Sequence, residues 1–124
     1  MKLLLDTHVL LWWIADEPLR DDANAAIAAP RSIVCVSAVS AVEIGLKSAI
    51  GKLRAPDDLE GQLRRHRFMH LPVTIAHGLR VGEIPVLHGD PFDRLLVAQA
   101  QLEGLTIVTR DPRIAAYDVE TLAA

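Results

Sequence analysis

The apolar residues of this chain gather in short blocks, separated by longer stretches of mixed character. Three blocks are rich in leucine, isoleucine and valine, which predicts buried strands at Lys2–Leu5, Ser32–Val36 and Leu105–Val108. The blocks Phe68–Val73 and Tyr117–Leu122 are expected to add shorter strands, the second at an edge. The pattern therefore predicts a sheet built from short strands.

The stretches between the blocks have helical character. Helices are expected over Thr7–Ala15, Leu19–Ala29, Ser37–Leu53, Asp57–Arg67, Thr74–Gly82 and Pro91–Glu103, with a turn or short helix after Asp111. Thr7 and Asp90 are predicted N-caps, and Gly104 is a natural C-terminal stop. In Ser37–Leu53 a single stripe, expected to be buried, is formed by Val39, Val42, Leu46, Ile50 and Leu53.

Strands that alternate with helices predict an α/β fold with a doubly wound, mostly parallel central sheet. No repeat, linker or low-complexity tract divides residues 1–124, so we expect a single domain. Ligands of such sheets bind outside the carboxyl ends of the strands. Asp6 and Asp111 both follow a predicted strand, and this is the first physical reason to place them together.

Composition and charge narrow the class of protein only modestly. The single cysteine, Cys35, lies in an apolar strand and excludes a disulfide framework within one chain, so a cytoplasmic location is expected. The apolar amino terminus is interrupted at Asp6 and has no small-residue cleavage site, which argues against secretion. No stretch is long enough to span a membrane. A net charge of −3 neither supports nor excludes a polyanionic substrate.

Two further acids lie inside predicted helices beside apolar residues. Glu43 adjoins the predicted stripe, and Asp93 is followed at helical spacing by Leu96, Val97 and Ala100. Simpler interpretations stay open: Asp6 and Asp111 as helix caps, Glu43 in a capping box with Ser40, and Asp93 as an acid favoured by the helix dipole.

The four carboxylates of Asp6, Glu43, Asp93 and Asp111 are costly to desolvate, and no lysine or arginine is obviously placed to pair with all of them. A divalent metal would compensate the whole set. Carboxylates without cysteine or histidine companions favour a hard cation, Mg²⁺ or Mn²⁺, over zinc. Thr7 and Thr109 are placed to orient these carboxylates, although ordinary capping is the alternative for both.

Four short motifs now stand in order along the chain. They run from Leu3 to His8, from Val36 to Glu43, from Asp90 to Ala100 and from Ile107 to Asp111. Together they resemble a PIN domain, and more narrowly the VapC-type toxins of type II toxin–antitoxin pairs. The resemblance covers essentially the whole chain and implies a PIN-like three-layer α/β/α sandwich.

The same resemblance implies a Mg²⁺- or Mn²⁺-dependent endoribonuclease whose four-acid site corresponds to Asp6, Glu43, Asp93 and Asp111. Metal-activated water would cleave RNA and leave 5′-phosphate and 3′-hydroxyl ends. A VapB-type antitoxin and a homodimer are the implied partners. Possible RNA contacts are Arg94 and Arg110, each beside a site acid, while the run Arg64–Arg67 is more typical of a solvated face.

Other functions are less well supported by the residues. A haloacid-dehalogenase-like phosphohydrolase would need a second aspartate two residues after the first, where this chain has His8. A phosphate-receiver domain would want a lysine after a late strand, where this chain has Arg110. The alternatives that remain are another metal-dependent phosphohydrolase and a catalytically silent PIN-like binding module. Trp12 and Trp13 point about 100° apart on a helix, so one could serve the core and the other a partner.

Overall fold

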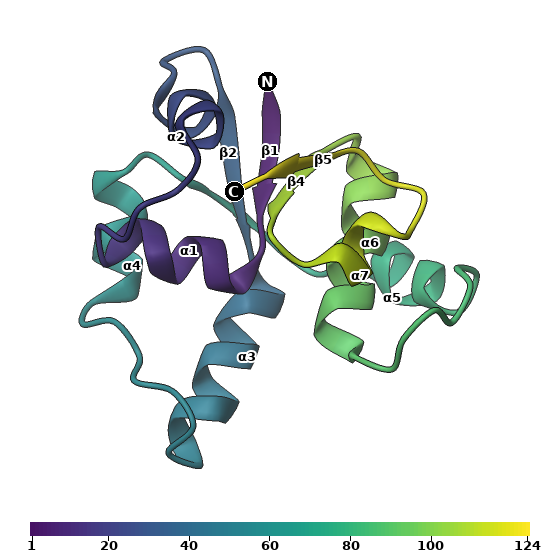
Figure 1. The fold of residues 1–124 in the computed structure, drawn as a ribbon. Coiled ribbons are helices and arrows are strands. Elements are labelled where there is room, and N and C mark those ends of the chain that lie inside the picture. Colours follow the sequence, from purple (N-terminus) through teal and green to yellow (C-terminus); the bar gives the residue numbers. More distant parts are fainter.

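A five-stranded sheet forms the centre of the computed structural model, which describes residues 1–124 (Figure 1). The strands are β1 (Lys2–Leu5), β2 (Ile33–Ser37), β3 (Met69–Leu71), β4 (Thr106–Thr109) and β5 (Thr121–Ala123). Their order across the sheet is β3-β2-β1-β4-β5, and every neighbouring pair is parallel. The predicted mostly parallel sheet is confirmed, and it is parallel throughout.

Seven helices surround this sheet. They are α1 (Thr7–Ile14), α2 (Asp21–Ala28), α3 (Ala38–Ala49), α4 (Leu59–Arg65), α5 (Ile75–Val81), α6 (Pro91–Glu103) and α7 (Pro112–Ala115). In Figure 1, α1, α2 and α4 lie on one side of the sheet, and α5, α6 and α7 lie on the other. The predicted three-layer α/β/α sandwich is therefore confirmed. No helix combines the length and the apolar composition needed to cross a membrane.

Two apolar clusters fill the spaces between the layers. Along β1, Leu3 and Leu5 face the cluster under α1 and α2, whereas Leu4 faces the cluster under α6. All three side chains are fully buried, and each contributes roughly 1.5–3 kcal/mol to folding by leaving water. Because β1 is the central strand, its carboxyl end is held in a fixed position between the two helical layers.

Helix α3 departs from the sequence prediction. The predicted stripe was expected to be buried, but Val42, Leu46 and Ile50 are 54%, 56% and 65% exposed. Within α3 only Val39 of the predicted stripe is buried, and the other buried residues of the helix are Ser40, Glu43 and Ile44. The helix projects beyond the carboxyl ends of the strands, so its far half has no layer beneath it (Figure 1). It ends at Ala49 rather than Leu53.

Two helix starts decide between interpretations that the sequence left open. Asp6, and not Thr7, is the N-cap of α1, where its carboxylate accepts a hydrogen bond from the backbone N–H of Val9. Ser37 caps α3, so the helix begins before Ser40 and the Ser40–Glu43 capping box does not form. Glu43 is consequently free of a capping role.

A buried polar network joins the two halves of the molecule behind these helix starts. The Ser37 hydroxyl at the end of β2 donates to Oε1 of Gln99 in the middle of α6, at 2.5 Å. Nε2 of Gln99 donates to the carbonyl of Pro72 at 3.2 Å. Both side chains are buried. This network fixes the start of α3 against α6, the two helices that carry Glu43 and Asp93.

Candidate active site

Asp6 and Asp111 meet at the carboxyl end of the sheet, where the topology predicts a site. Strands β1 and β4 are neighbours in parallel register, and Leu5 pairs with Val108. The hydroxyl of Thr109 lies between the two acids: it donates to Oδ2 of Asp6 at 2.5 Å and accepts from the backbone N–H of Asp111 at 2.9 Å. The Thr109 hydroxyl therefore links Asp6 to the backbone of Asp111.

Both acids also cap helices, so the two interpretations of each are compatible. Oδ1 of Asp6 accepts from Val9 N–H at 2.8 Å at the start of α1. Oδ1 of Asp111 accepts from the N–H of Arg113 at 2.9 Å at the start of α7. The caps hold the carboxylates at the ends of their strands and leave each side chain facing the same space.

Glu43 and Asp93 reach that space from helices on its two sides. Glu43 lies on the buried face of α3 and is 4% exposed. Asp93 lies in the first turn of α6, above Leu96 and Val97, which are fully buried. The helical spacing used to place Asp93 off the wet face is confirmed.

One cavity collects all four acids. Its volume is about 400 Å³, and only one of its twelve lining residues is hydrophobic. The lining residues are Asp6, Thr7, His8, Trp12, Glu43, Lys47, Asp90, Asp93, Arg110, Asp111, Pro112 and Arg113. Asp90, expected to be only a helix cap, caps α6 through Oδ1 and also lines this cavity. The cavity thus holds five carboxylates.

Cationic and polar partners compensate these acids more fully than the sequence suggested. Nζ of Lys47, one turn along α3, lies 2.5 Å from Oε2 of Glu43. The guanidinium of Arg113 donates to both carboxylate oxygens of Asp111. Lysine and arginine thus pair with two of the four acids, and neither Asp6 nor Asp93 has such a partner. Lys47 is the i+4 neighbour of Glu43, a spacing that identifies such pairs in sequence.

Asp93 has a different partner, the side chain of His88. Nε2 of His88 lies 3.2 Å from Oδ2 of Asp93, and Nδ1 of His88 lies 3.0 Å from the hydroxyl of Tyr117. That hydroxyl also accepts hydrogen bonds from the backbone N–H groups of Leu87 and His88. Tyr117 and His88 together fix the orientation of Asp93. No short sequence motif connects residues so far apart along the chain.

The surroundings of the acids shift their pKa values in opposite directions. Burial raises the pKa of Asp6 and of Asp93 above the ordinary value, against the hydrogen bonds from Thr109 and His88. The hydrogen-bonded guanidinium of Arg113 lowers the pKa of Asp111. The carboxylate of Glu43 raises the pKa of Lys47. Asp6 is buried and has no cationic side chain bonded to it.

The donor set fits a hard divalent cation by its chemistry. All five acidic side chains offer carboxylate oxygens, the ligands that Mg²⁺ and Mn²⁺ prefer, and no cysteine lines the cavity. No three acidic, histidine or cysteine side chains stand in an arrangement that could hold a metal ion as they are placed. A metal-bound state therefore requires side chains such as Glu43 and Asp111 to exchange their ion pairs for the metal.

The remaining predicted site residues differ in where they lie. Thr7 lines the cavity, but its hydroxyl donates to Ser40 at 2.9 Å and does not contact Asp6. Arg110 lines the cavity, with its guanidinium 4.2 Å from the centre of the Trp12 ring. Arg94 is directed away, toward the carbonyls of Val81 and Ile84, and does not line the cavity.

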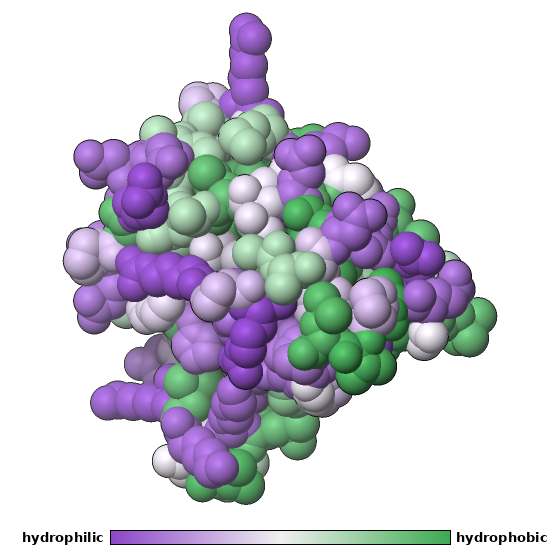
Figure 2. Space-filling view, turned by 45° about the vertical axis from the view of Figure 1, so that its right-hand side comes forward, coloured by the Kyte–Doolittle hydropathy of each residue, from purple (hydrophilic) through white to green (hydrophobic).

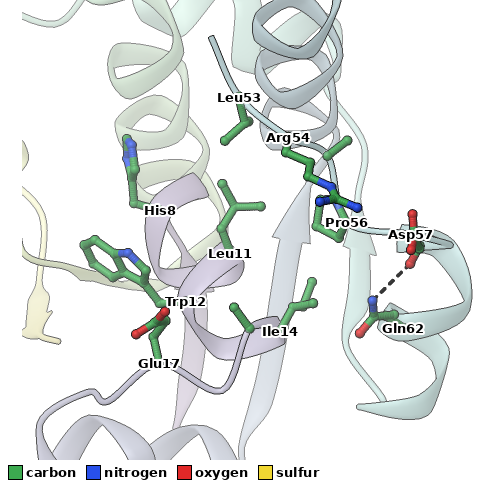
Figure 3. A pocket seen from close by; sticks show the side chains of 12 residues that line it. His8, Leu11, Trp12, Ile14, Glu17, Leu53, Arg54, Pro56, Asp57 and Gln62 are labelled. Atoms are coloured by element: carbon green, nitrogen blue, oxygen red, sulfur yellow. Dashed lines mark hydrogen bonds between the residues drawn. The ribbon is translucent and has the colours of Figure 1, made fainter. Parts of the chain in front are cut away.

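A second, more apolar cavity of about 540 Å³ adjoins the first. It lies between α1 and the segment that leads from Leu53 into α4, and Leu11, Ile14, Leu53 and Pro56 contribute apolar surface (Figure 3). His8 and Trp12 line both cavities. The acidic cavity therefore opens onto a groove that offers apolar contacts.

Comparison with known proteins decides the family. The sequence model described as PIN domain matches residues 3–120, nearly the whole chain. The chain belongs to the PIN domain family. No curated protein sequence matches it.

Several solved structures share this fold over almost their full length. VapBC2 from Rickettsia felis, bound to a DNA fragment of its promoter, superposes with a TM-score of 0.75 at 17% identity, covering 99% of this PIN domain and 98% of that chain. DNA-bound VapBC from Salmonella typhimurium gives 0.72 at 18% identity with the same coverage. VapBC-1 from nontypeable Haemophilus influenzae gives 0.63 at 17%, again with 99% and 98% covered. At these identities the likeness shows the fold alone.

Proposed function

We propose that this PIN domain is a metal-dependent endoribonuclease and the toxin component of a type II toxin–antitoxin pair. The observation that carries the proposal is the cavity at the carboxyl ends of β1 and β4, where five carboxylates converge, four from the starts of α1, α6 and α7 and one from the interior of α3. Its family and its structural likeness to VapBC proteins support the same conclusion. A cytoplasmic location is part of the proposal, since the RNA substrate lies there.

Asp6, Glu43, Asp93 and Asp111 are the residues proposed to hold Mg²⁺ or Mn²⁺. When bound, the cation would supply an activated water and stabilise the negative charge that develops on the phosphoryl group. Thr7 is the one serine, threonine or cysteine that lines the cavity, and its hydroxyl donates to Ser40 and not to a general base, so the proposal uses no side-chain nucleophile. Hydrolysis in this way leaves 5′-phosphate and 3′-hydroxyl ends.

The chain's own cations have a second role in this proposal. Lys47 and Arg113 neutralise Glu43 and Asp111 in the protein as it stands. Once the acids bind metal, these two side chains and Arg110 are the cavity-lining cations able to bind a phosphate. Arg94, which binds backbone carbonyls away from the cavity, is left out of the proposed RNA contacts.

A VapB-type antitoxin is the proposed protein partner. Several solved structures with a similar fold are VapBC assemblies, and the apolar groove beside α1 offers a surface for an apolar segment of such a partner. His8 and Trp12 line this groove and the acidic cavity alike. A partner seated in the groove would therefore stand at the entrance to the acids.

We further propose a homodimer that uses the projecting helix α3. Val42, Leu46 and Ile50 stand one turn apart and leave an apolar stripe in water. Apolar surface is visible at the lower end of the molecule, where α3 projects (Figure 2). Covering it with the same stripe of a second copy would bury these side chains from both chains.

RNA cleavage, assayed with and without a chelator, tests the proposed activity. The purified protein with mixed RNA should produce fragments in Mn²⁺ or Mg²⁺, and none in excess chelator. Asp6→Asn should lose most of the cleavage, because it removes the buried charge next to Thr109. Cleavage that ignores both the chelator and the substitution would reject the proposal.

One observation favours the alternative of a catalytically silent binding module. The acids Glu43 and Asp111 are already ion-paired, so the cavity is neutralised in part without a metal. RNA binding without any cleavage in either metal would support that alternative.

A further inference from the structure

We infer that His8 and Trp12 form a stacking subsite for an unpaired nucleobase next to the cleaved phosphate. This inference rests on the proposed ribonuclease activity and names its substrate class: single-stranded RNA. His8 and Trp12 are the two residues shared by the acidic cavity and the apolar groove. A nucleotide whose phosphate lies at the acids has its base within reach of this boundary.

Helix spacing places the two rings together. His8 and Trp12 are one turn apart on α1, with ring centres 5.9 Å apart and planes inclined at 40°. They project from the same side of α1, whereas Leu11 and Ile14 project toward the segment that carries Leu53 and Pro56 (Figure 3). Of the four, only the aromatic pair also borders the acidic cavity, whereas Leu11 and Ile14 line the groove and not that cavity.

Arg110 contacts the indole ring of Trp12 and helps to hold it in place. Its Cζ lies 4.2 Å from the centre of the Trp12 ring, which is a cation–π contact. The guanidinium is itself fixed, because Nε donates to the carbonyl of Ala124 and the NH₂ group donates to the carbonyl of Pro18. The ring is thus held on one face by a positioned cation, next to the site of a negatively charged phosphate.

The neighbouring Trp13 lacks these features. Its indole N–H donates to Nδ1 of His66 at 3.3 Å, and its ring packs against Phe68. It lines neither cavity. The chain therefore offers two adjacent tryptophans, of which only one borders the acids, and they form a matched pair for experiment.

A ligand that fits this subsite must have a flat aromatic face that is free to stack. Every nucleobase has one, and base–aromatic stacking tolerates any sequence. A base inside a duplex is already stacked and must leave the helix before it can reach Trp12. The subsite therefore favours unpaired RNA and gives little choice among bases.

Cleavage kinetics on a random pool of single-stranded oligoribonucleotides test the subsite. Trp12→Leu should raise the apparent KM by roughly tenfold, the loss of one stacked base, while kcat changes little. Trp12→Phe should restore most of the loss, and Trp13→Leu should leave KM unchanged. An unchanged KM in Trp12→Leu, or a Trp12→Leu effect confined to binding of the antitoxin, would overturn the inference.

Fluorescence supplies a readout that needs no cleavage. In Trp13→Phe, Trp12 is the only tryptophan, and its emission should be quenched by single-stranded oligoadenylate in the presence of chelator. An oligomer of abasic ribose phosphates should quench far less. Equal quenching by both would overturn the inference. If the unsubstituted protein cleaves no RNA, the proposed function fails, and this titration decides the stacking subsite alone.

Discussion

At the residue scale, the burial of Asp6 disfavours the negative charge of its carboxylate. The side chain is 6% exposed, it bonds to Thr109 and to the backbone of Val9, and no cationic side chain is bonded to it. These hydrogen bonds recover only part of the solvation that a carboxylate loses on burial, and its pKa is raised accordingly. The proposed cation in the cavity would recover the rest, which would link metal binding to folding at Asp6.

The raised pKa of Asp6 predicts how the stability of the Asp6→Asn variant depends on pH. A raised folded pKa means that the stability contributed by Asp6 is fully present below its unfolded value near 3.8 and is lost as the pH rises through the folded pKa. Without metal, the variant should therefore match the parent in acid and be more stable at neutral pH, by about 1.4 kcal/mol for each unit between the two pKa values. Thermal unfolding across this pH range measures the difference.

The exposed Asp118 provides the control for that series, since Asp118→Asn removes a carboxylate that water already solvates. It should follow the parent at every pH. A neutral-pH loss of stability in Asp6→Asn would contradict the account of Asp6.

Single residues were predictable from sequence where a local rule applies. Asp6 and Asp111 follow strands, and Asp90 precedes a proline at a helix start, so their places followed from the sequence. The partners of the acids were harder to predict. Lys47 and Arg113 stand near their acids in sequence, but His88 reaches Asp93 through a loop whose path depends on Tyr117, far along the chain.

At the element scale, α3 shows why periodicity alone does not identify a buried face. The spacing of Val42, Leu46 and Ile50 is that of an amphipathic helix, yet these residues face water. The same helix buries Ser40 and Glu43 instead. Periodicity reports that a face is apolar, and the tertiary arrangement decides whether the chain itself covers it. The strands were predicted more accurately because a parallel sheet buries both of their faces.

The exposed stripe predicts how the dimer can be broken. Leu46→Lys together with Ile50→Lys should convert a dimer to a monomer, because each charge would otherwise be buried against the second copy. Sedimentation velocity at increasing protein concentration measures this. The double variant should keep its helical circular dichroism, since neither side chain is buried within the chain.

Ile44 is the matched comparison on the buried face of α3. Ile44→Ala should lower the free energy of unfolding by about 2–5 kcal/mol, which denaturant unfolding would detect. A double lysine variant that sediments like its parent would contradict the proposed dimer surface.

At the scale of the whole molecule, the sheet unites residues that lie far apart in the sequence. Asp6 and Asp111 end adjacent strands, and α3 and α6 bring Glu43 and Asp93 from the two sides, fixed by the buried bond from Ser37 to Gln99. The fold places negatively charged carboxylates together, and their repulsion lowers the stability of the folded protein unless cations neutralise them. Binding of the proposed cation would therefore be coupled to folding of the whole domain.

This coupling predicts stabilisation by metal. Mg²⁺ or Mn²⁺ at a hundred times its dissociation constant should stabilise the folded protein by about 2.7 kcal/mol, seen as a rise in Tm. The rise should vanish in chelator and be much smaller in Asp93→Asn. An equal rise in parent and variant would show that the metal binds elsewhere.

The central claim is that four acids act together with a divalent cation to cut RNA. Its most direct test is the Mn²⁺-dependent cleavage rate of Asp6→Asn, Glu43→Gln, Asp93→Asn and Asp111→Asn, measured beside Asp118→Asn on one RNA preparation. The account predicts that each of the four loses at least about a hundredfold in rate, within the range that general acid–base and electrostatic groups contribute, while Asp118→Asn matches the parent. Four variants that cleave at the parental rate would contradict it.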